Sequence, residues 1–203
     1  MKTTKLLLAM VIALAFVPSL ASADNVALNK DVTLNGTFFT DAGGWGAGTV
    51  SPGSRIVNGT FAGEETQWNL DGVWWNGSSN PNNNIVIDLK GTYRISSFTV
   101  QADDNDTYRV LYLDAHNTWQ TAYDVPYQFS FGLVTRPEYT LPTPIVTSAL
   151  QFVATGGDGD YSVSQIVANG GAVPIPGALL LFGPGLVGLG AVRRKIRNRM
   201  LFR

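Results

Sequence analysis

The amino-acid sequence predicts an all-β protein, an antiparallel β-sandwich flanked by two terminal segments. Short stretches that are rich in β-branched residues, or that alternate polar and apolar residues, recur between Asn84 and Ala172. Clusters of Gly, Asn and Asp separate these stretches, and no long segment repeats apolar residues with the 3.6-residue period of a helix. Many short strands joined by such turns indicate a sandwich or jelly roll rather than a parallel α/β fold.

The first 23 residues have the three parts of a secretory signal peptide. Two lysines precede an apolar run at residues 6–16, and the small residues Ala21 and Ala23 form a cleavage motif. We therefore expect export and cleavage before Asp24. The chain has no cysteine, so the exported domain must depend on core burial rather than on disulfides, and thiol catalysis and thiolate metal sites are excluded.

The domain predicted at residues 24–172 is acidic. It holds all fifteen acidic residues and six of the fourteen basic residues, hence a net charge of −9, whereas the last eleven residues of the chain hold six Lys or Arg. An acidic surface of this kind repels nucleic acid, which excludes nucleic acid as a partner.

The strand signals follow one another toward the C-terminus of this domain. They lie at Asn84–Leu89, Arg94–Ala102 and Tyr108–Leu113, and then in the segments ALQFVAT and YSVSQIVANG. The preceding stretch, Gly36–Asn84, has few strand signals and many Gly, Asn and Trp residues. Loops of such length inside a compact domain are usually functional or packed as Ω-loops.

Five segments occur in an order typical of one protein family. They read NVALNKDVT, IVNGT…ETQW, NNNIVIDLKGTYRISSFTV, YRVLYLDAHNTWQ and ALQFVATGGDGDYSVSQIVANG. The set resembles the discoidin domains, the family of the coagulation-factor C domains, across nearly the whole of residues 24–172. The resemblance implies an eight-stranded antiparallel β-sandwich jelly roll whose loops at one end bind ligands, commonly glycans or anionic lipid headgroups. It also matches Trp68 and Trp119 to core positions of the family.

Aromatic residues in glycine-rich segments are the strongest sign of ligand binding. Flat aromatic faces beside Asn and Asp provide the apolar platform and the polar groups that a sugar-binding cleft needs. The candidates for carbohydrate contact are Trp45, Trp74, Trp75, Tyr127 and Phe129, with Phe131 close by. Packing in the core or anchoring of the long loop is the alternative role. In the adjacent tryptophan pair, one side chain can be core and the other exposed.

The sequence offers little for catalysis, and we predict that the protein is not an enzyme. His116, the only histidine, lies in a predicted hairpin turn, and G-x-S-x-G, H-E-x-x-H and C-x-x-C motifs are absent. Glycoside hydrolysis needs two carboxyl groups at a set separation. The acidic clusters at residues 64–65, 103–106 and 158–160 are expected to be solvated turns, without apolar surroundings that would raise a pKa.

Two positions are candidates for a structural calcium ion, which prefers carboxylate and carbonyl oxygens. The resemblance implies one site between the loop after Val57 and the closing strand, with the candidate ligands Asn58, Thr60, Thr66 and Gln165. Amides replace both expected carboxylates there, which weakens such a site. The segment Ala102–Tyr108 offers a second site, for which a plain connecting loop is the alternative. Its candidate ligands are Asp103, Asp104 and Asp106.

The C-terminal segment combines a proline motif, an apolar run and a basic cluster. The motif is Val173, Pro174, Ile175 and Pro176, the run covers residues 177–192, and the cluster at 193–203 begins with Arg193 and Arg194. The run is shorter than the ~20 residues with which a helix crosses a bilayer, although the preceding residues can add length. It has no polar face, which argues against a buried core helix, and the basic cluster is expected to remain cytoplasmic.

This tail resembles the PEP-CTERM sorting signal of Gram-negative bacteria, with Ile175 where glutamate is usual. The resemblance implies an exosortase-type protease as a partner, a transient anchor in the inner membrane, and delivery to the cell surface or its extracellular matrix. We therefore hypothesise an exported, non-catalytic protein, similar to a carbohydrate-binding module, that interacts with exopolysaccharide. The alternatives are a structural surface or biofilm-matrix protein without a specific small ligand, and a glycoside hydrolase.

Overall fold

The computed structural model describes residues 23–36, 50–76 and 82–173 of the 203-residue chain. Outside these ranges lie the predicted site residues Ala21, Trp45, Pro174, Ile175, Pro176, Arg193 and Arg194, for which the predictions stay predictions. The chain divides into the units Met1–Ala172 and Val173–Arg203, and the fold described below is that of the first unit. No helix within the described ranges is long and apolar enough to span a membrane.

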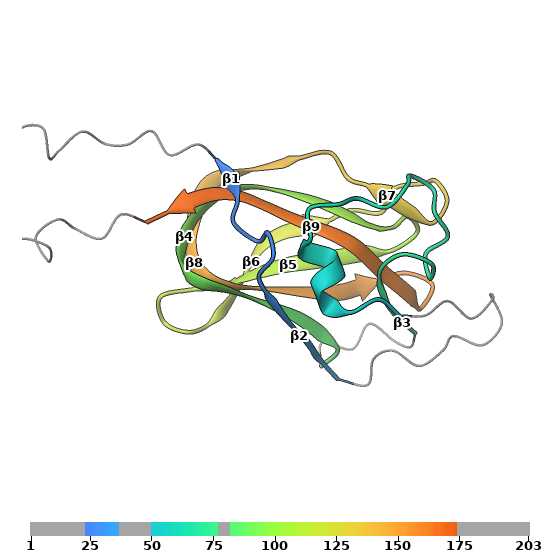
Figure 1. Ribbon diagram of the computed structural model, residues 1–203, viewed down its shortest axis with the longest axis horizontal. Helices are drawn as coiled ribbons and strands as arrows, with labels where there is room; N and C mark the ends of the chain where they lie inside the picture. The colour runs from blue at the N-terminus through green and yellow to red at the C-terminus, as the bar shows by residue number, and fades with distance from the viewer. Residues whose placement is uncertain (1–22, 37–49, 77–81, 174–203) are drawn as a thin grey trace, which may run out of the picture. The chain divides into compact units, whose positions relative to one another are not determined.

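The predicted all-β fold is confirmed. Nine strands and one short 3₁₀ helix, η1, are defined in the described part of the chain, and the strands pair antiparallel (Figure 1). They are β1 (Asp24–Asn25), β2 (Asp31–Asn35), η1 (Gly53–Val57), β3 (Val73–Asn76), β4 (Asn84–Asp103), β5 (Thr107–Leu113), β6 (Trp119–Val125), β7 (Leu133–Thr135), β8 (Tyr139–Gly156) and β9 (Asp160–Ala172). The resemblance predicts eight strands. The structure has more strands because short segments such as β1 and β7, of two and three residues, pair with a neighbour and count as separate strands.

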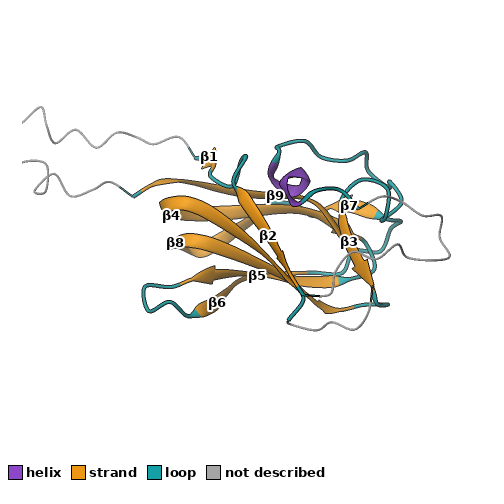
Figure 2. Cartoon of the chain, turned by 60° about the horizontal axis from the view of Figure 1, so that its bottom comes forward, coloured by secondary structure: helices purple, strands orange, loops and turns teal. Residues whose placement is uncertain are grey.

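The two long strands β4 and β8 connect the two layers of the sandwich (Figures 1 and 2). The first half of β4 pairs with β2 and with the end of β8, and its second half pairs with β9, β7 and the start of β8. The register between β4 and β8 shifts between Asp88 and Tyr93, where Lys90 adopts a left-handed φ of 58°. Such an irregularity bends both strands, so each continues from one layer into the other.

The core lies between the layers and follows the alternation visible in the sequence. In β4 the side chains of Ile85, Ile87 and Leu89 are buried, and the residues between them are more exposed. The strands β5 and β8 add aromatic rings, with Tyr108 stacked on Phe152 at a centroid separation of 5.0 Å. Burial of these apolar groups is the main stabilising contribution in a chain without disulfides.

One end of the sandwich carries the connections that form the candidate site. They are the turn between β4 and β5, the turn between β8 and β9, and the segment between β6 and β7. Near the other end, β1 pairs with the last part of β9, with Asp24 opposite Gly170 (Figure 1). The two ends of the described domain therefore lie side by side, away from those connections.

Candidate functional site

The tryptophan pair of β3 lies in the core. Trp74 and Trp75 are 0% and 1% exposed. The Trp74 ring meets the Trp68 ring edge to face at 5.6 Å, and the Trp75 ring packs beside Tyr108 and Tyr161. Both faces of β3 are thus covered, and neither tryptophan offers a free ring to a sugar. The prediction that Trp74 and Trp75 form an exposed binding platform is therefore wrong, and their role is packing.

Three exposed aromatic side chains lie in the segment between β6 and β7, which we name the 126–132 loop. Their exposed fractions are 49% for Tyr127, 88% for Phe129 and 58% for Phe131. The loop backbone is held in place, since the Gln128 N–H donates to the Asp104 carbonyl at 2.9 Å and the Ser130 N–H donates to the Asp104 carboxylate at 3.1 Å. Tyr127 and Phe129, predicted to contact carbohydrate, are therefore accessible to a ligand, and their role stays a prediction.

Gly132 fixes the end of this loop. Its φ is 59°, and a Cβ at this position would lie 2.2 Å from the carbonyl oxygen of Thr66. The next residue, Leu133, donates its N–H to the same oxygen at 2.8 Å. Thr66, predicted as a calcium ligand, thus joins the 126–132 loop to the segment before β3, a role that the sequence did not indicate.

A pocket of about 190 Å³ opens beside the 126–132 loop, and we call it the acidic pocket. Its walls come from the end of β4 and the turn after it, the turn between β8 and β9 with the start of β9, the segment before β3, and the loop itself. It is lined by Gln67, Trp68, Asp103, Asp104, Asn105, Phe131, Gly132, Asp158 and Asp160. Aspartates beside aromatic residues suit a polar ligand that also has an apolar face.

A wider groove, of about 520 Å³, lies between residues 112–122 and 141–146. The carboxylate in its lining, Asp114, already accepts hydrogen bonds from the backbone N–H groups of His116 and Thr118 in the hairpin turn. The lining of this groove contains one carboxylate, whereas the acidic pocket combines four aspartates with Trp68 and Phe131. The smaller acidic pocket is the better candidate site.

The three aspartates that follow one another at the end of β4 and in the turn after it are buried, contrary to the expectation of a solvated turn, whereas Asp158 in the pocket lining is exposed. Asp103, Asp104 and Asp106 are 2%, 7% and 0% exposed. Burial raises the pKa of Asp103 to about 7, and the charge of the neighbouring Asp104 adds to the rise. Burial raises the pKa of Asp106 to about 8, against the effect of the hydrogen bond that Tyr108 donates at 2.9 Å. The expectation that nothing in this segment would raise a pKa is wrong because loops distant in sequence cover it.

A buried arginine connects these loops. Arg136 is 0% exposed, and its guanidinium donates only to backbone carbonyls in the described structure. The acceptors are Ala102 at 2.7 Å, Asp103 at 2.6 Å, Val134 at 2.9 Å, Pro126 at 3.2 Å, Asp104 at 3.4 Å and Asp106 at 3.5 Å. The positive charge therefore stabilises the backbone around the acidic pocket rather than forming an ion pair with one aspartate.

The carboxylates of the acidic pocket have no cationic side chain within ion-pair distance among the described residues. The ion pairs found among the described residues lie outside the pocket and join Arg55 to Asp71, Lys90 to Asp31 and Asp88, and Arg109 to Asp124. The Oδ1 atom of Asn105 is buried without a hydrogen-bond partner. No group of three or more His, Cys, Asp or Glu in the described ranges is arranged to hold a metal ion. Asp103, Asp104 and Asp106 therefore do not form a preformed calcium site in the described structure, and calcium binding by them stays a prediction.

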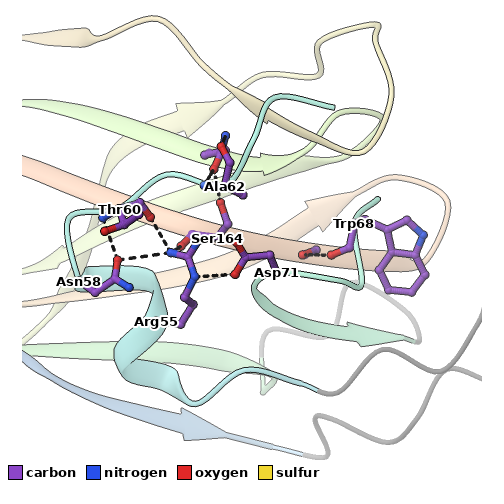
Figure 3. Close-up of polar contacts among 9 residues, drawn as sticks. Arg55, Asn58, Thr60, Ala62, Trp68, Asp71 and Ser164 are labelled. Atoms are coloured by element: carbon purple, nitrogen blue, oxygen red, sulfur yellow. Dashed lines mark hydrogen bonds and ion pairs between the residues drawn. The ribbon is translucent and has the colours of Figure 1, made fainter. Parts of the chain in front are cut away.

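At the other predicted calcium position, an arginine places its charge among the expected ligands (Figure 3). The Nη1 atom of Arg55 lies 2.6 Å from the Thr60 carbonyl oxygen, 3.3 Å from Asn58 Oδ1 and 3.2 Å from the Ser164 carbonyl oxygen. Its Nε and Nη2 atoms donate to the two carboxylate oxygens of Asp71 at 2.6 and 2.8 Å. Because these oxygens already face a positive charge, the residues do not fit a calcium ion.

Gln165 completes this arrangement. With its amide nitrogen turned toward the loop, Gln165 donates to the Thr60 carbonyl and to Asn58 Oδ1, both at 3.2 Å, and accepts from the Gly59 N–H at 3.1 Å. Three of the four predicted ligands, Asn58, Thr60 and Gln165, therefore do lie together. The oxygens of Asn58 and Thr60, however, accept hydrogen bonds from the nitrogens of Arg55 and Gln165. Arg55 is the residue that the sequence did not reveal, since Ser164, one of its partners, is 109 positions away.

Comparisons with known proteins show the fold. No protein-family model and no curated protein matches the chain. Among solved structures, an f-lectin (fucolectin) from the serum of the striped bass Morone saxatilis matches with a TM-score of 0.53 and 11% identity, over 74% of this chain and 50% of that chain. A family 32 CBM from Clostridium perfringens NanJ, in complex with galactose, matches with a TM-score of 0.49 and 11% identity, over 73% and 98% of the two chains. The likeness to the fucolectin supports the predicted discoidin-like β-sandwich, and at this identity it shows the fold alone.

We expect Arg136→Met to destabilise the domain by at least about 3 kcal/mol. The change leaves several buried carbonyl oxygens without a donor, and each such loss costs about 1–3 kcal/mol. Urea denaturation measures the effect, and Arg94→Met, at an exposed strand position, is the matched control with an expected change below about 0.5 kcal/mol. Equal stability of the two variants would contradict the role given to Arg136.

We expect the free energy of unfolding to decrease as the pH rises from about 5 to 9. The folded state binds protons at Asp103 and Asp106 more tightly than the unfolded chain does, since their pKa values are raised to about 7 and about 8 from 3.8. This contribution is present at low pH and is lost as the pH passes through the raised values. Asp103→Asn should flatten the decrease in denaturation measured at several pH values, and Asp124→Asn should not. A stability that rises over this range in the native chain would overturn the assignment.

Calcium is expected to leave the thermal stability of the native chain unchanged. Arg55 supplies the positive charge near Asn58 and Gln165. In a variant with Arg55→Ala, Asn58→Asp and Gln165→Glu, calcium at ~100 times its Kd should add about 2.7 kcal/mol. The pair Asn58→Asp and Gln165→Glu, with Arg55 retained, is the control and should not respond. A calcium-dependent rise of Tm in the native chain, measured by calorimetry against a chelator, would count against this prediction.

Proposed function

We propose that this chain is an exported, non-catalytic glycan-binding protein whose site consists of the acidic pocket and the 126–132 loop. The observation that carries the proposal is the exposure of Phe129 and Phe131 beside a pocket lined by aspartates. A pyranose ring has an apolar face that stacks on an aromatic side chain and hydroxyl groups that donate to carboxylate oxygens. The site offers both an aromatic ring, that of Phe131, and aspartate carboxyl groups in the lining of one pocket.

The fold supports the proposal without carrying it. The fucolectin of similar fold is named as a lectin, but one fold accommodates many functions, so the argument depends on the residues. The predicted signal peptide and sorting tail are consistent with action at the cell surface or in its exopolysaccharide matrix, with an exosortase-type protease as the processing partner. Exopolysaccharide is then the glycan that the protein meets first.

The raised pKa of Asp103 makes catalysis an alternative function to consider. A carboxyl group with a pKa of about 7 suits a general acid. Asp106, the other aspartate with a raised pKa, does not line the acidic pocket and accepts a hydrogen bond from Tyr108. It is therefore engaged with the core, so the two aspartates with strongly raised pKa values do not face one cleft as the acid and nucleophile of a hydrolase do.

A glycan array and a pull-down with exopolysaccharide test the proposal. Loss of both rings in Phe129→Ala with Phe131→Ala should lower the affinity for the bound glycan by about fivefold if one ring stacks on the sugar and about thirtyfold if both do, since one aromatic stacking contact contributes about 1 kcal/mol. Val146→Ala, which removes an exposed apolar side chain from the wider groove, is the control and should bind as the native chain does. Unchanged binding by the double variant, or no binding by the native chain, would contradict the site. Release of new reducing ends during incubation would contradict the non-catalytic assignment.

A further inference from the structure

The acidic pocket contains acceptor oxygens that lack donors. Asp103 lines the pocket and is 2% exposed, and its carboxylate accepts a hydrogen bond only from the adjacent Asp104 N–H, at 3.1 Å, among the described residues. Asn105 directs its Nδ2 to Asp158 at 2.8 Å, while its buried Oδ1 has no partner. Buried acceptors of this kind are costly unless a donor reaches them, so the pocket is best completed by a molecule that supplies N–H groups.

The side chains of the described residues do not supply these N–H groups. The one buried guanidinium nearby, that of Arg136, donates to backbone carbonyls. The ion pairs of the described chain involve other carboxylates. Asp103, Asp104, Asp158 and Asp160 therefore place four carboxyl groups in the pocket lining, and no cationic side chain among the described residues forms an ion pair with them. A cation bound beside Asp103, whose pKa is about 7 in the free protein, favours the ionised form of that carboxyl.

We propose that the acidic pocket binds a protonated primary amine, and that the glycan recognised by this protein therefore contains amino sugars whose amines are not acetylated. The proposal rests on the proposed function and narrows its ligand class. An ammonium group carries three N–H donors and no acceptor, which matches a wall of carboxylate and amide oxygens. Trp68 and Phe131 in the same lining provide apolar faces for the sugar ring and attract a cation through their π-systems.

The shape of the pocket favours an organic cation over a metal ion. Calcium needs six to eight oxygens around one point, at about 2.3–2.6 Å. The carboxylates of the described residues do not converge in such groups. The pocket volume of about 190 Å³ corresponds to about six water molecules at ~30 Å³ each, which leaves room for part of a sugar in addition to its amine. Acceptors spread along the wall of such a space fit a ring that carries a charged substituent.

Isothermal titration calorimetry near neutral pH, in physiological salt, tests the proposal with two probes that differ in acetylation. The probes are the β-1,4-linked glucosamine dimer and its N,N′-diacetylated form. The glucosamine dimer should bind the purified chain at least about tenfold more tightly, because an ammonium makes charge-assisted hydrogen bonds that an acetamide does not. Asp103→Asn and Asp158→Asn keep the side-chain shape but remove one charge, and each should weaken the glucosamine dimer by about tenfold or more.

Controls separate the proposal from general attraction to an acidic domain. Asp124→Asn removes one charge from an exposed position paired with Arg109, and should bind as the native chain does. Equal losses in this variant and in Asp103→Asn would mean diffuse attraction and would overturn the proposal. Calcium that binds in an Asp103-dependent manner, with no binding of the glucosamine dimer, would also overturn it. If the native chain bound both dimers with equal affinity, and Phe131→Ala lowered that affinity, the amine specificity would be overturned and the proposed function would remain in place. A native chain that binds neither dimer and no glycan on the array would remove both.

Discussion

The guanidinium of Arg136 places a buried positive charge where four chain segments meet, and it donates to backbone carbonyls of all four. It reaches the end of β4, the turn that follows, the start of the 126–132 loop and β7. Burial of a charge in this way is favourable only because carbonyl oxygens surround it. The same geometry explains the electrostatics of the pocket. Burial raises the pKa values of Asp103 and Asp106, and the charge of Arg136, whose donors are engaged with the backbone, opposes the rise at Asp103 without forming an ion pair.

A second arginine, the half-buried Arg55, shows a different use of the same chemistry. Arg55 is shared between the carboxylate of Asp71 and the oxygens of the loop that follows η1. Here the charge is neutralised by a carboxylate, and the loop is fixed without a metal ion. One arginine thus stabilises a loop, and the other stabilises the framework of a pocket that keeps its negative charge. The described part of the chain is acidic overall, but the charge that matters for binding is the part that neither arginine neutralises.

Local sequence patterns predicted the strands well and the site poorly. Alternation in β4 and in the closing strands identifies the core because every second side chain must point inward. Trp74 and Trp75 stand in a glycine-rich segment, which resembles a loop until β3 pairs with β9 and both rings become covered. Asp103 and Asp106 look like turn residues, and their burial depends on loops 20 to 55 positions away, as does every contact of Arg136 with the pocket. A pattern within one segment contains no information about which distant segment covers it.

The strand β9 connects the acidic pocket to the C-terminal end of the domain. It begins at Asp160, in the wall of the acidic pocket, and ends at Ala172, which directly precedes the tail. Thirteen residues of extended chain span about 40 Å at ~3.3 Å per residue. Under the proposed function, a domain joined through its C-terminus would therefore hold the acidic pocket at the other end of β9 from the point of attachment. The proposed attachment and the proposed recognition then lie at opposite ends of one strand, so that the pocket faces polymer chains beyond the surface to which the protein is joined.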